Sequence, residues 1–207
     1  MHLAAADLDA DSTYRLLSGI VVPRPIAWVT TQSSTGLVNL APFSCYTFVC
    51  NRPPMLGITF GRKAGVRKDS ATHILDSREY VVNIGTFAQR EQVHASSEEH
   101  PADVSETDLL GLATLPSQVV GVPRLADAPI SMECRLRQVV PFGELGSEFF
   151  VGEVVSFHIR EGLYRDGKID TRELDPICRI GGPNYASLGE IVTLKHVAAT
   201  PRGATAS

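Results

Sequence analysis

Apolar residues along the chain recur most often with the two-residue period of β-strands. Residues 130–137 alternate strictly between apolar and polar side chains, which predicts a half-buried strand. Residues 149–160 repeat the pattern, with His158 on the polar face. The face of this second segment expected to be buried carries Phe149, Val151, Val155, Phe157 and Ile159. Two long strands are therefore predicted in the second half of the chain.

Four shorter apolar or β-branched runs predict further strands. They cover residues 26–31, 37–41, 55–60 and 79–84, and a run at 188–195 suggests one more short strand. Glycine and proline turns separate these runs. Many short strands with helices inserted between them favour a mostly antiparallel β-barrel over a doubly wound sheet.

The segment from Pro25 to Asn51 contains 27 residues without a single charge. Its length alone would suffice to cross a bilayer, but its interior is interrupted by the polar residues 32–36. This interruption predicts two strands joined in a hairpin. A hairpin without charges is expected at the centre of a sheet, or facing something other than water.

Helices are predicted to be few and short. One is expected at Ser70–Asp76, and another from about Phe87 to Glu99, opened by Thr86 and Gln89 in capping-box spacing. A helical turn is expected near Asp108. Residues 198–207 are expected to form a frayed tail.

Composition indicates a globular protein with one hydrophobic core. The 207 residues are 43% hydrophobic and 20% charged, and their number suits a single domain. The net charge of -4 removes the attraction that supplies most non-specific nucleic-acid binding, so DNA and RNA are not expected partners. The first residues lack a basic region and no membrane segment is predicted, which favours a cytoplasmic protein.

Motifs of the common chemistries are absent from the sequence. It contains no GxGxxG after a strand, no P-loop, no HExxH and no GxSxG. The four cysteines and six histidines form no pair at metal-ligand spacing, so no metal site is expected and the cysteines are interpreted as structural thiols.

A basic loop at residues 62–68 carries four cations and runs into Asp69 and Ser70 at the start of a predicted helix. Cations, a hydroxyl and exposed helix N–H groups together can hold a phosphate. A solvated turn in which Asp69 or Ser70 only caps the helix explains the same residues. The polar members of the uncharged hairpin and the residues that follow it would suit a flat cofactor with a phosphate tail. These are Thr30, Thr31, Asn39, Ser44 and Tyr46.

Several blocks of the sequence, taken in their order and spacing, resemble the flavin reductase-like family of FMN-binding split barrels, which includes flavoredoxin. The blocks are residues 23–31, Gly36, 39–44, 53–54, 68–70, 80–83 and 178–185. The resemblance covers roughly residues 10–195. It implies a six-stranded antiparallel Greek-key split β-barrel that forms a homodimer and binds FMN at or near the subunit interface.

The resemblance also implies roles for individual residues. Thr30 and Thr31 would lie near the phosphate end of FMN, and Arg179 and Tyr185 near the flavin or the dimer seam. The residues bordering the isoalloxazine would be Asn39, Ala41, Pro42, Ser44, Cys45 and Tyr46. Those holding the ribityl phosphate would be Arg62, Lys68, Asp69 and Ser70. Two positions depart from the family pattern, because Ser70 replaces the usual Thr and His73 a common Asn.

The chemistry implied by the resemblance is hydride transfer from NAD(P)H to the flavin, with reduced flavin passed to an acceptor or a partner oxygenase. The flavin supplies the reactive atoms, so no catalytic side chain is required. His158 is a candidate for a catalytic role, and a structural role explains it equally well. Two alternatives remain open: an electron-transfer flavoprotein of the flavoredoxin type, and a non-enzymatic FMN-binding protein.

Overall fold

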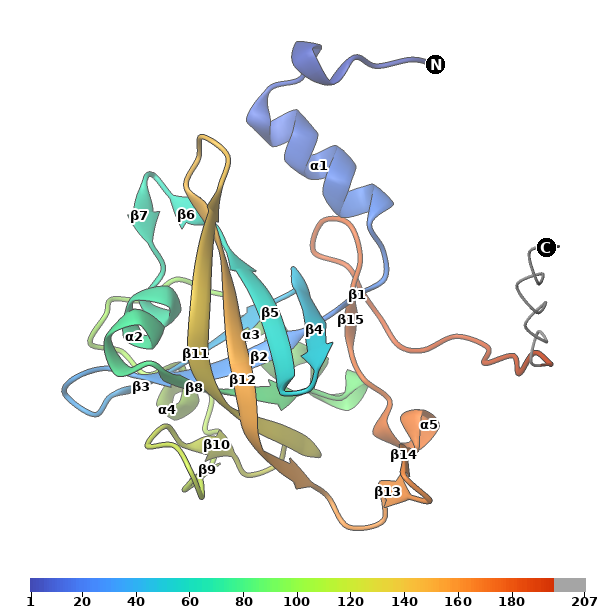
Figure 1. Cartoon of the computed structure of the whole chain (residues 1–207). Coiled ribbons are helices and arrows are strands. Elements are labelled where there is room, and N and C mark those ends of the chain that lie inside the picture. Colours follow the sequence, from blue (N-terminus) through green and yellow to red (C-terminus); the bar gives the residue numbers. More distant parts are fainter. Residues whose placement is uncertain (196–207) are drawn as a thin grey trace, which may run out of the picture.

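A seven-stranded antiparallel sheet forms the centre of the computed structural model, which describes residues 1–195 (Figure 1). Its strands follow the order β3-β2-β8-β11-β12-β5-β4. They are β2 (Ala27–Gln32), β3 (Val38–Phe43), β4 (Tyr46–Asn51), β5 (Pro54–Phe60), β8 (Glu79–Ile84), β11 (Ile130–Phe142) and β12 (Ser147–Ile159). The chain is therefore mainly β, with a large antiparallel sheet, as the sequence predicts.

Short helices surround the sheet. They are α1 (Ala10–Ile20), α2 (Asp69–Ser77), α3 (Arg90–Ala95), α4 (Glu106–Leu109) and α5 (Thr171–Leu174), with 3-10 turns η1 (Ala5–Asp7) and η2 (Phe87–Gln89). Helix α2 packs on β2 and β3, and α4 packs on β3. Helix α1 buries no residue and extends away from the sheet (Figure 1). No helix within residues 1–195 is long and apolar enough to span a bilayer.

Nine two-residue strands complete the described secondary structure. They are β1 (Arg24–Pro25), β6 (Arg62–Lys63), β7 (Val66–Arg67), β9 (Thr114–Leu115), β10 (Arg124–Leu125), β13 (Tyr164–Arg165), β14 (Lys168–Ile169), β15 (Cys178–Arg179) and β16 (Tyr185–Ala186). Strands β6 and β7 form a hairpin, and β1 pairs with β15, which brings the segment before β2 to the late part of the chain.

The main core lies on the inner face of the sheet and is built around aromatic residues. The rings of Phe43, Phe60 and Phe150 pack in sequence, with centroids 4.5 and 4.7 Å apart. Trp28 lies on the opposite face of β2 in a second cluster and donates its indole N–H to Ser96 Oγ at 2.8 Å. This bond ties the segment after α3 to the sheet.

Most predicted elements form, with differences at the sheet edge. The hairpin of β2 and β3 is present, as are α2, the capping box of η2 and the turn at α4. The six strands predicted from the sequence do not include β4. Phe48 and Val49 of β4 are exposed, so this strand lacks the apolar–polar alternation that marks a half-buried strand. Residues 188–195 form no strand, which corrects that prediction. The predicted frayed tail, residues 198–207, lies outside the described residues.

Strand β11 is buried on both faces near its start, where the alternation predicts one polar, solvated face. Ser131 and Glu133 have no exposed surface, because the segment 118–125 covers them. Leu125 N–H donates to Asn83 Oδ1, which also accepts from Ser131 Oγ. Hydrogen bonds with the segment 118–125 thus replace the hydrogen bonds with water that the apolar–polar alternation predicts for this face.

The predicted inner face of β12 is partly wrong. Phe150 and Val154 lie in the core, whereas Phe157 is 53% exposed. Register shifts in the pairing of β11 with β12, between Glu133 and Cys134 and between Leu136 and Gln138, interrupt the two-residue period.

Candidate functional site

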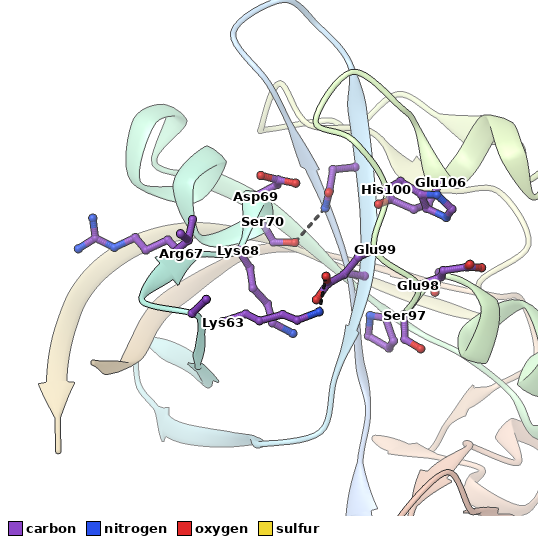
Figure 2. Close-up of a pocket in the computed structure, with 16 residues that line it drawn as sticks. Lys63, Arg67, Lys68, Asp69, Ser70, Ser97, Glu98, Glu99, His100 and Glu106 are labelled. Carbon is purple, nitrogen blue, oxygen red and sulfur yellow. Dashed lines mark hydrogen bonds and ion pairs between the residues drawn. The ribbon is translucent and has the colours of Figure 1, made fainter. Parts of the chain in front are cut away.

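A cavity of about 390 Å³ opens beside the start of α2 (Figure 2). Strand β3, the β6–β7 hairpin and the first residues of α2 form one side, and the segment after α3 forms the other. The lining residues are Asn39, Ala41, Pro42, Lys63, Ala64, Val66, Arg67, Lys68, Asp69, Ser70, Ser96, Ser97, Glu98, Glu99, His100 and Glu106. The cavity therefore joins the uncharged hairpin to the basic loop.

Six of the residues implied by the family resemblance line this cavity. They are Asn39, Ala41, Pro42, Lys68, Asp69 and Ser70. A buried hydrogen bond from Asn39 Nδ2 to Ser70 Oγ, 2.9 Å long, links β3 to α2 (Figure 2). The two parts of the predicted site thus meet through side chains named from the sequence.

The amino terminus of α2 lies at the cavity without a side-chain cap. Lys68 is the N-cap residue, and its carbonyl accepts the N–H groups of Ala71 and Thr72. Neither Asp69 nor Ser70 caps the helix, which corrects the alternative interpretation of these two residues as a cap. An uncapped first turn leaves N–H groups and the positive end of the helix dipole for another partner.

The basic loop divides its four cations between two carboxylates and the cavity. Arg67 forms two 2.8 Å hydrogen bonds with Glu148, and Arg62 lies 3.6 Å from the same carboxylate. Hydrogen bonds from Arg67 hold the pKa of Glu148 below its ordinary value, against the effect of burial. Lys63 pairs with Glu99 at 2.5 Å. Arg62 does not line the cavity, although the family resemblance implies a phosphate contact for it.

Lys68 is the remaining cation of this loop. Its Nζ lies 5.5 Å from the centroid of the Phe43 ring, and within residues 1–195 no carboxylate is close enough to form an ion pair with it. A cation in this state is the one most available to an anionic ligand.

Thr30 and Thr31 are engaged away from the cavity. Thr30 Oγ1 donates to the carbonyl of Pro123 at 2.7 Å and accepts from Asn83. Thr31 Oγ1 lies 3.2 Å from His73 Nδ1 on α2. Both side chains are buried and join β2 to its neighbours, and neither lines the cavity.

Ser44, Cys45 and Tyr46 follow the cavity-lining part of β3 without lining the cavity themselves. Ser44 Oγ accepts from Arg24 Nε at 3.2 Å, and Arg24 also donates to the carbonyls of residues 18, 21 and 180. Burial raises the pKa of the Tyr46 hydroxyl well above its ordinary value, so it is a neutral phenol. Cys45 is exposed.

Arg179 and Tyr185 form a polar cluster with His94 of α3, and none of the three residues lines the cavity. Arg179 donates to the Tyr185 hydroxyl and lies over its ring, 4.6 Å from the centroid. His94 Nδ1 is 3.0 Å from the same hydroxyl. Burial raises the pKa of Tyr185, and Arg179 opposes this rise. The cluster joins the late segment to α3, whose continuation forms the far wall of the cavity.

His158 lies in a structural contact outside the cavity. Its Nε2 is 2.5 Å from Glu133, which also accepts the backbone N–H groups of Gln118, Val119 and Val120. Burial raises the pKa of Glu133, but these hydrogen bonds more than offset it, so the pKa is lowered overall. The pair anchors the segment that covers β11.

The far wall of the cavity was not predicted from the sequence. It comprises Ser96–His100 and Glu106. The buried carboxylate of Glu106 accepts the N–H of Leu40 at 2.9 Å. The positions of α3 and α4 bring these residues to the cavity, and no motif in the sequence marks them. Within residues 1–195, no three His, Cys, Asp or Glu side chains are grouped to hold a metal ion.

Comparison with known proteins identifies the family. A family model described as flavin reductase like domain matches residues 18–173. Nitrilotriacetate monooxygenase component B from Bacillus cereus is 34% identical, with a TM-score of 0.91 over 94% of this chain and 98% of its own. The 2-nitrobenzoate 2-nitroreductase of Pseudomonas fluorescens is 32% identical, with a TM-score of 0.83 over 97% and 98% of the two chains.

A third structure supports the fold alone. A split-barrel domain protein from Shewanella frigidimarina is 20% identical, with a TM-score of 0.84 over 95% of this chain and 100% of its own. The TM-scores of the three neighbours thus show that they share the overall fold of this chain. Together with the match over residues 18–173, they show that the chain belongs to the flavin reductase-like family.

Proposed function

We propose that the chain forms one FMN-binding split-barrel domain that transfers hydride from NAD(P)H to the flavin and delivers the electrons to an acceptor or partner oxygenase. The observation that carries the proposal is that Lys68, Ser70 and the uncapped start of α2 line the same cavity as Asn39, Ala41 and Pro42 of β3. Groups that could bind an anion thus lie beside a strand without charged residues.

The donor set fits a phosphate monoester. An ammonium group, a hydroxyl and helix N–H groups are the usual partners of a phosphate at a helix amino terminus. The cavity volume of about 390 Å³ lies within the range of small-molecule sites. Lys68 and Ser70 would hold the phosphate of FMN, and Asp69 would remain at the helix start, where its charge suits the dipole.

The remaining residues fit the ring system. Asn39, Ala41 and Pro42 present a strand without charges, and Ser44 continues the same chain segment next to the buried Arg24. When bound, the flavin would accept a hydride from the nicotinamide. The protein's part in this reaction is to bind the flavin and the nicotinamide and to orient them toward each other.

A partner oxygenase and a second subunit belong to the same proposal. The similarity to a monooxygenase component B supports delivery of reduced flavin to an oxygenase. Exposed apolar residues on α1 and β4, including Tyr14, Ile20 and Phe48, support a homodimer in which these surfaces are covered. Arg179 and Tyr185 would then lie at the dimer seam, and a cytoplasmic location would supply NAD(P)H.

The absorbance spectrum of the purified protein, loaded with FMN and mixed with NADH or NADPH without oxygen, tests the proposal. Loss of the oxidised flavin bands within seconds is expected. Flavin that is reduced only by a protein donor would favour the electron-transfer alternative, and flavin that neither donor reduces would favour a non-enzymatic FMN-binding protein. A nitroaromatic acceptor is included, because the Pseudomonas fluorescens relative is named as a nitroreductase.

A further inference from the structure

One ion pair crosses the cavity from wall to wall. Lys63 Nζ of β6 lies 2.5 Å from Glu99 Oε2 of the segment after α3. Figure 2 shows the side chains of Lys63 and Lys68 both extending toward the wall that carries Glu99. The Glu99 carboxylate therefore occupies a hydrogen-bonding position on Lys63 that an anionic ligand of this cavity would otherwise use.

This pair differs from the other ion pairs of the basic loop in its exposure. The side chains of Lys63 and Glu99 are 72% and 64% exposed, whereas Glu148 is 9% exposed and bonds Arg67 through both oxygens. Single contacts between exposed charges contribute little to stability, because solvent screens them. Of the two carboxylates that pair with this loop, Glu99 is thus the one readily displaced.

A phosphate has the chemistry to displace Glu99. It offers more negative charge and more acceptor oxygens than a carboxylate, so its hydrogen bonds with an ammonium group are stronger. Lys63 reaches the cavity on a flexible stem and needs only a change of rotamer to exchange partners. Glu99 and Glu98 also place negative charge on the wall opposite Lys68.

We propose that Glu99 is an internal competitor for the flavin phosphate. In the free protein Glu99 binds Lys63, and FMN binding transfers Lys63 from Glu99 to the phosphate. Phosphate binding at the hydrogen-bonding position that Glu99 occupies on Lys63 breaks this pair, so FMN is held less tightly than the two lysines alone would allow. The consequence is that FMN dissociates faster than the two lysines alone would allow. This inference rests on the proposed function.

The test compares Glu99→Gln with Glu98→Gln in the full chain, using FMN and riboflavin. Both variants remove one charge from the same wall, but Glu98 forms no ion pair within residues 1–195. Glu99→Gln is expected to bind FMN about three- to fivefold more tightly and to release it more slowly, with riboflavin binding unchanged. Glu98→Gln is expected to change FMN binding by less than about twofold, since Glu98 is exposed, pairs with neither lysine and carries a charge that solvent screens.

A double variant isolates the exchange of partners. In a Lys63→Gln background, the added Glu99→Gln change is expected to lose its effect on FMN. Weaker FMN binding by Glu99→Gln, or a gain equal to that of Glu98→Gln, would overturn the competitor role and leave FMN binding by the protein intact. Absence of FMN binding by the unaltered protein would overturn the proposed function, and this inference with it.

Discussion

Lys68 stands apart from the other cations of its loop by what it contacts. Arg62 and Arg67 are held by Glu148, and Lys63 is held by Glu99. Lys68 lies over the Phe43 ring at the start of α2, where the helix dipole and its own charge act in the same direction. Its charge is therefore expected to dominate recognition of a phosphate.

Reversal of this charge separates phosphate binding from ring binding. Lys68→Glu is expected to weaken FMN at least tenfold and riboflavin much less, because a charge-assisted hydrogen bond contributes about 1.5–3 kcal/mol and the new carboxylate repels the phosphate. Fluorescence titration of the apoprotein measures both ligands. Lys168→Glu makes the same change on β14, outside the cavity, and serves as the control. Equal losses for the two ligands would contradict the phosphate assignment.

The sequence predicts residues that lie together in the structure where they belong to one short motif or to two neighbouring elements. Ser70 and Asn39 were named from it, and they meet in a buried hydrogen bond. The family resemblance implies that Thr30 lies near the phosphate of FMN, and it does not predict the hydrogen bond from Thr30 to the carbonyl of Pro123. That bond depends on where the segment 118–125 folds. Glu99 was missed for the same reason, since only the tertiary fold brings it to Lys63.

The β6–β7 hairpin is fixed to β12 by Glu148, and this attachment is expected to depend on pH. The pKa of Glu148 lies below its ordinary value of 4.5, because Arg67 favours the carboxylate form. Its stabilising effect is therefore complete above about pH 4.5 and is lost as the pH falls through the lowered pKa. Glu148→Gln is expected to reduce the free energy of unfolding by about 1–2 kcal/mol at pH 7, a modest value because Arg67 is partly exposed.

Urea unfolding of both proteins between pH 3 and pH 7 measures this effect. The difference in the free energy of unfolding is expected to shrink below pH 4.5. A difference that stays constant across this range would show that Glu148 acts by packing and not by charge.

Strand β3 supplies the wall on which the ring is expected to lie, so space along it matters more than side-chain chemistry. Ala41 lines the cavity, and Ala41→Trp is expected to fill it and to lower flavin content by more than half, while circular dichroism remains unchanged. Ala113→Trp, at an exposed position outside the cavity, is the matched control. Full flavin content in Ala41→Trp would place the ring elsewhere.

Strands that bury an apolar face could be predicted from the sequence, whereas a strand that forms only by pairing with a neighbouring strand could not. Strands β2, β8 and β11 show clear apolar patterns and form where expected. Strand β4 exposes Phe48, and its pattern resembles that of no buried element. The irregularities between β11 and β12 shift which residues face the core, and nothing in the alternation marks where they occur.

The whole molecule leaves apolar surface uncovered in the single chain. Tyr14, Leu17 and Ile20 on α1 are 70%, 55% and 65% exposed, and Phe48 on β4 is 78% exposed. Light scattering is expected to give twice the chain mass of 22.4 kDa at low micromolar concentration. A mass of 22.4 kDa with flavin still bound would contradict a site shared between subunits.

A charge reversal at Arg179 is a second test of a flavin site shared between two subunits. Arg179→Glu is expected to lower flavin occupancy, because it reverses the charge beside Tyr185 in the cluster proposed to lie at the seam. Arg165→Glu, in the exposed β13–β14 hairpin, is the control. Unchanged occupancy in Arg179→Glu would assign this arginine to structure alone.

The fold class was available from the sequence because several motifs occur in a particular order across most of the chain. The resemblance drawn from these blocks agrees with the family match over residues 18–173. The number of strands and the far wall of the cavity were not available, because both depend on contacts between segments distant in sequence. The proposed pairing of two subunits was not predictable in detail, because the apolar patterns of one chain do not specify how two copies pack.

A crystal structure of the protein with FMN would show directly where the ligand binds. The phosphate is expected within hydrogen-bond distance of Lys68 Nζ, Ser70 and the first N–H groups of α2, with the ring along Asn39, Ala41 and Pro42. Lys63 is expected to have turned from Glu99 to the phosphate. A phosphate bound at another surface, with this cavity free of ligand, would contradict the proposed site.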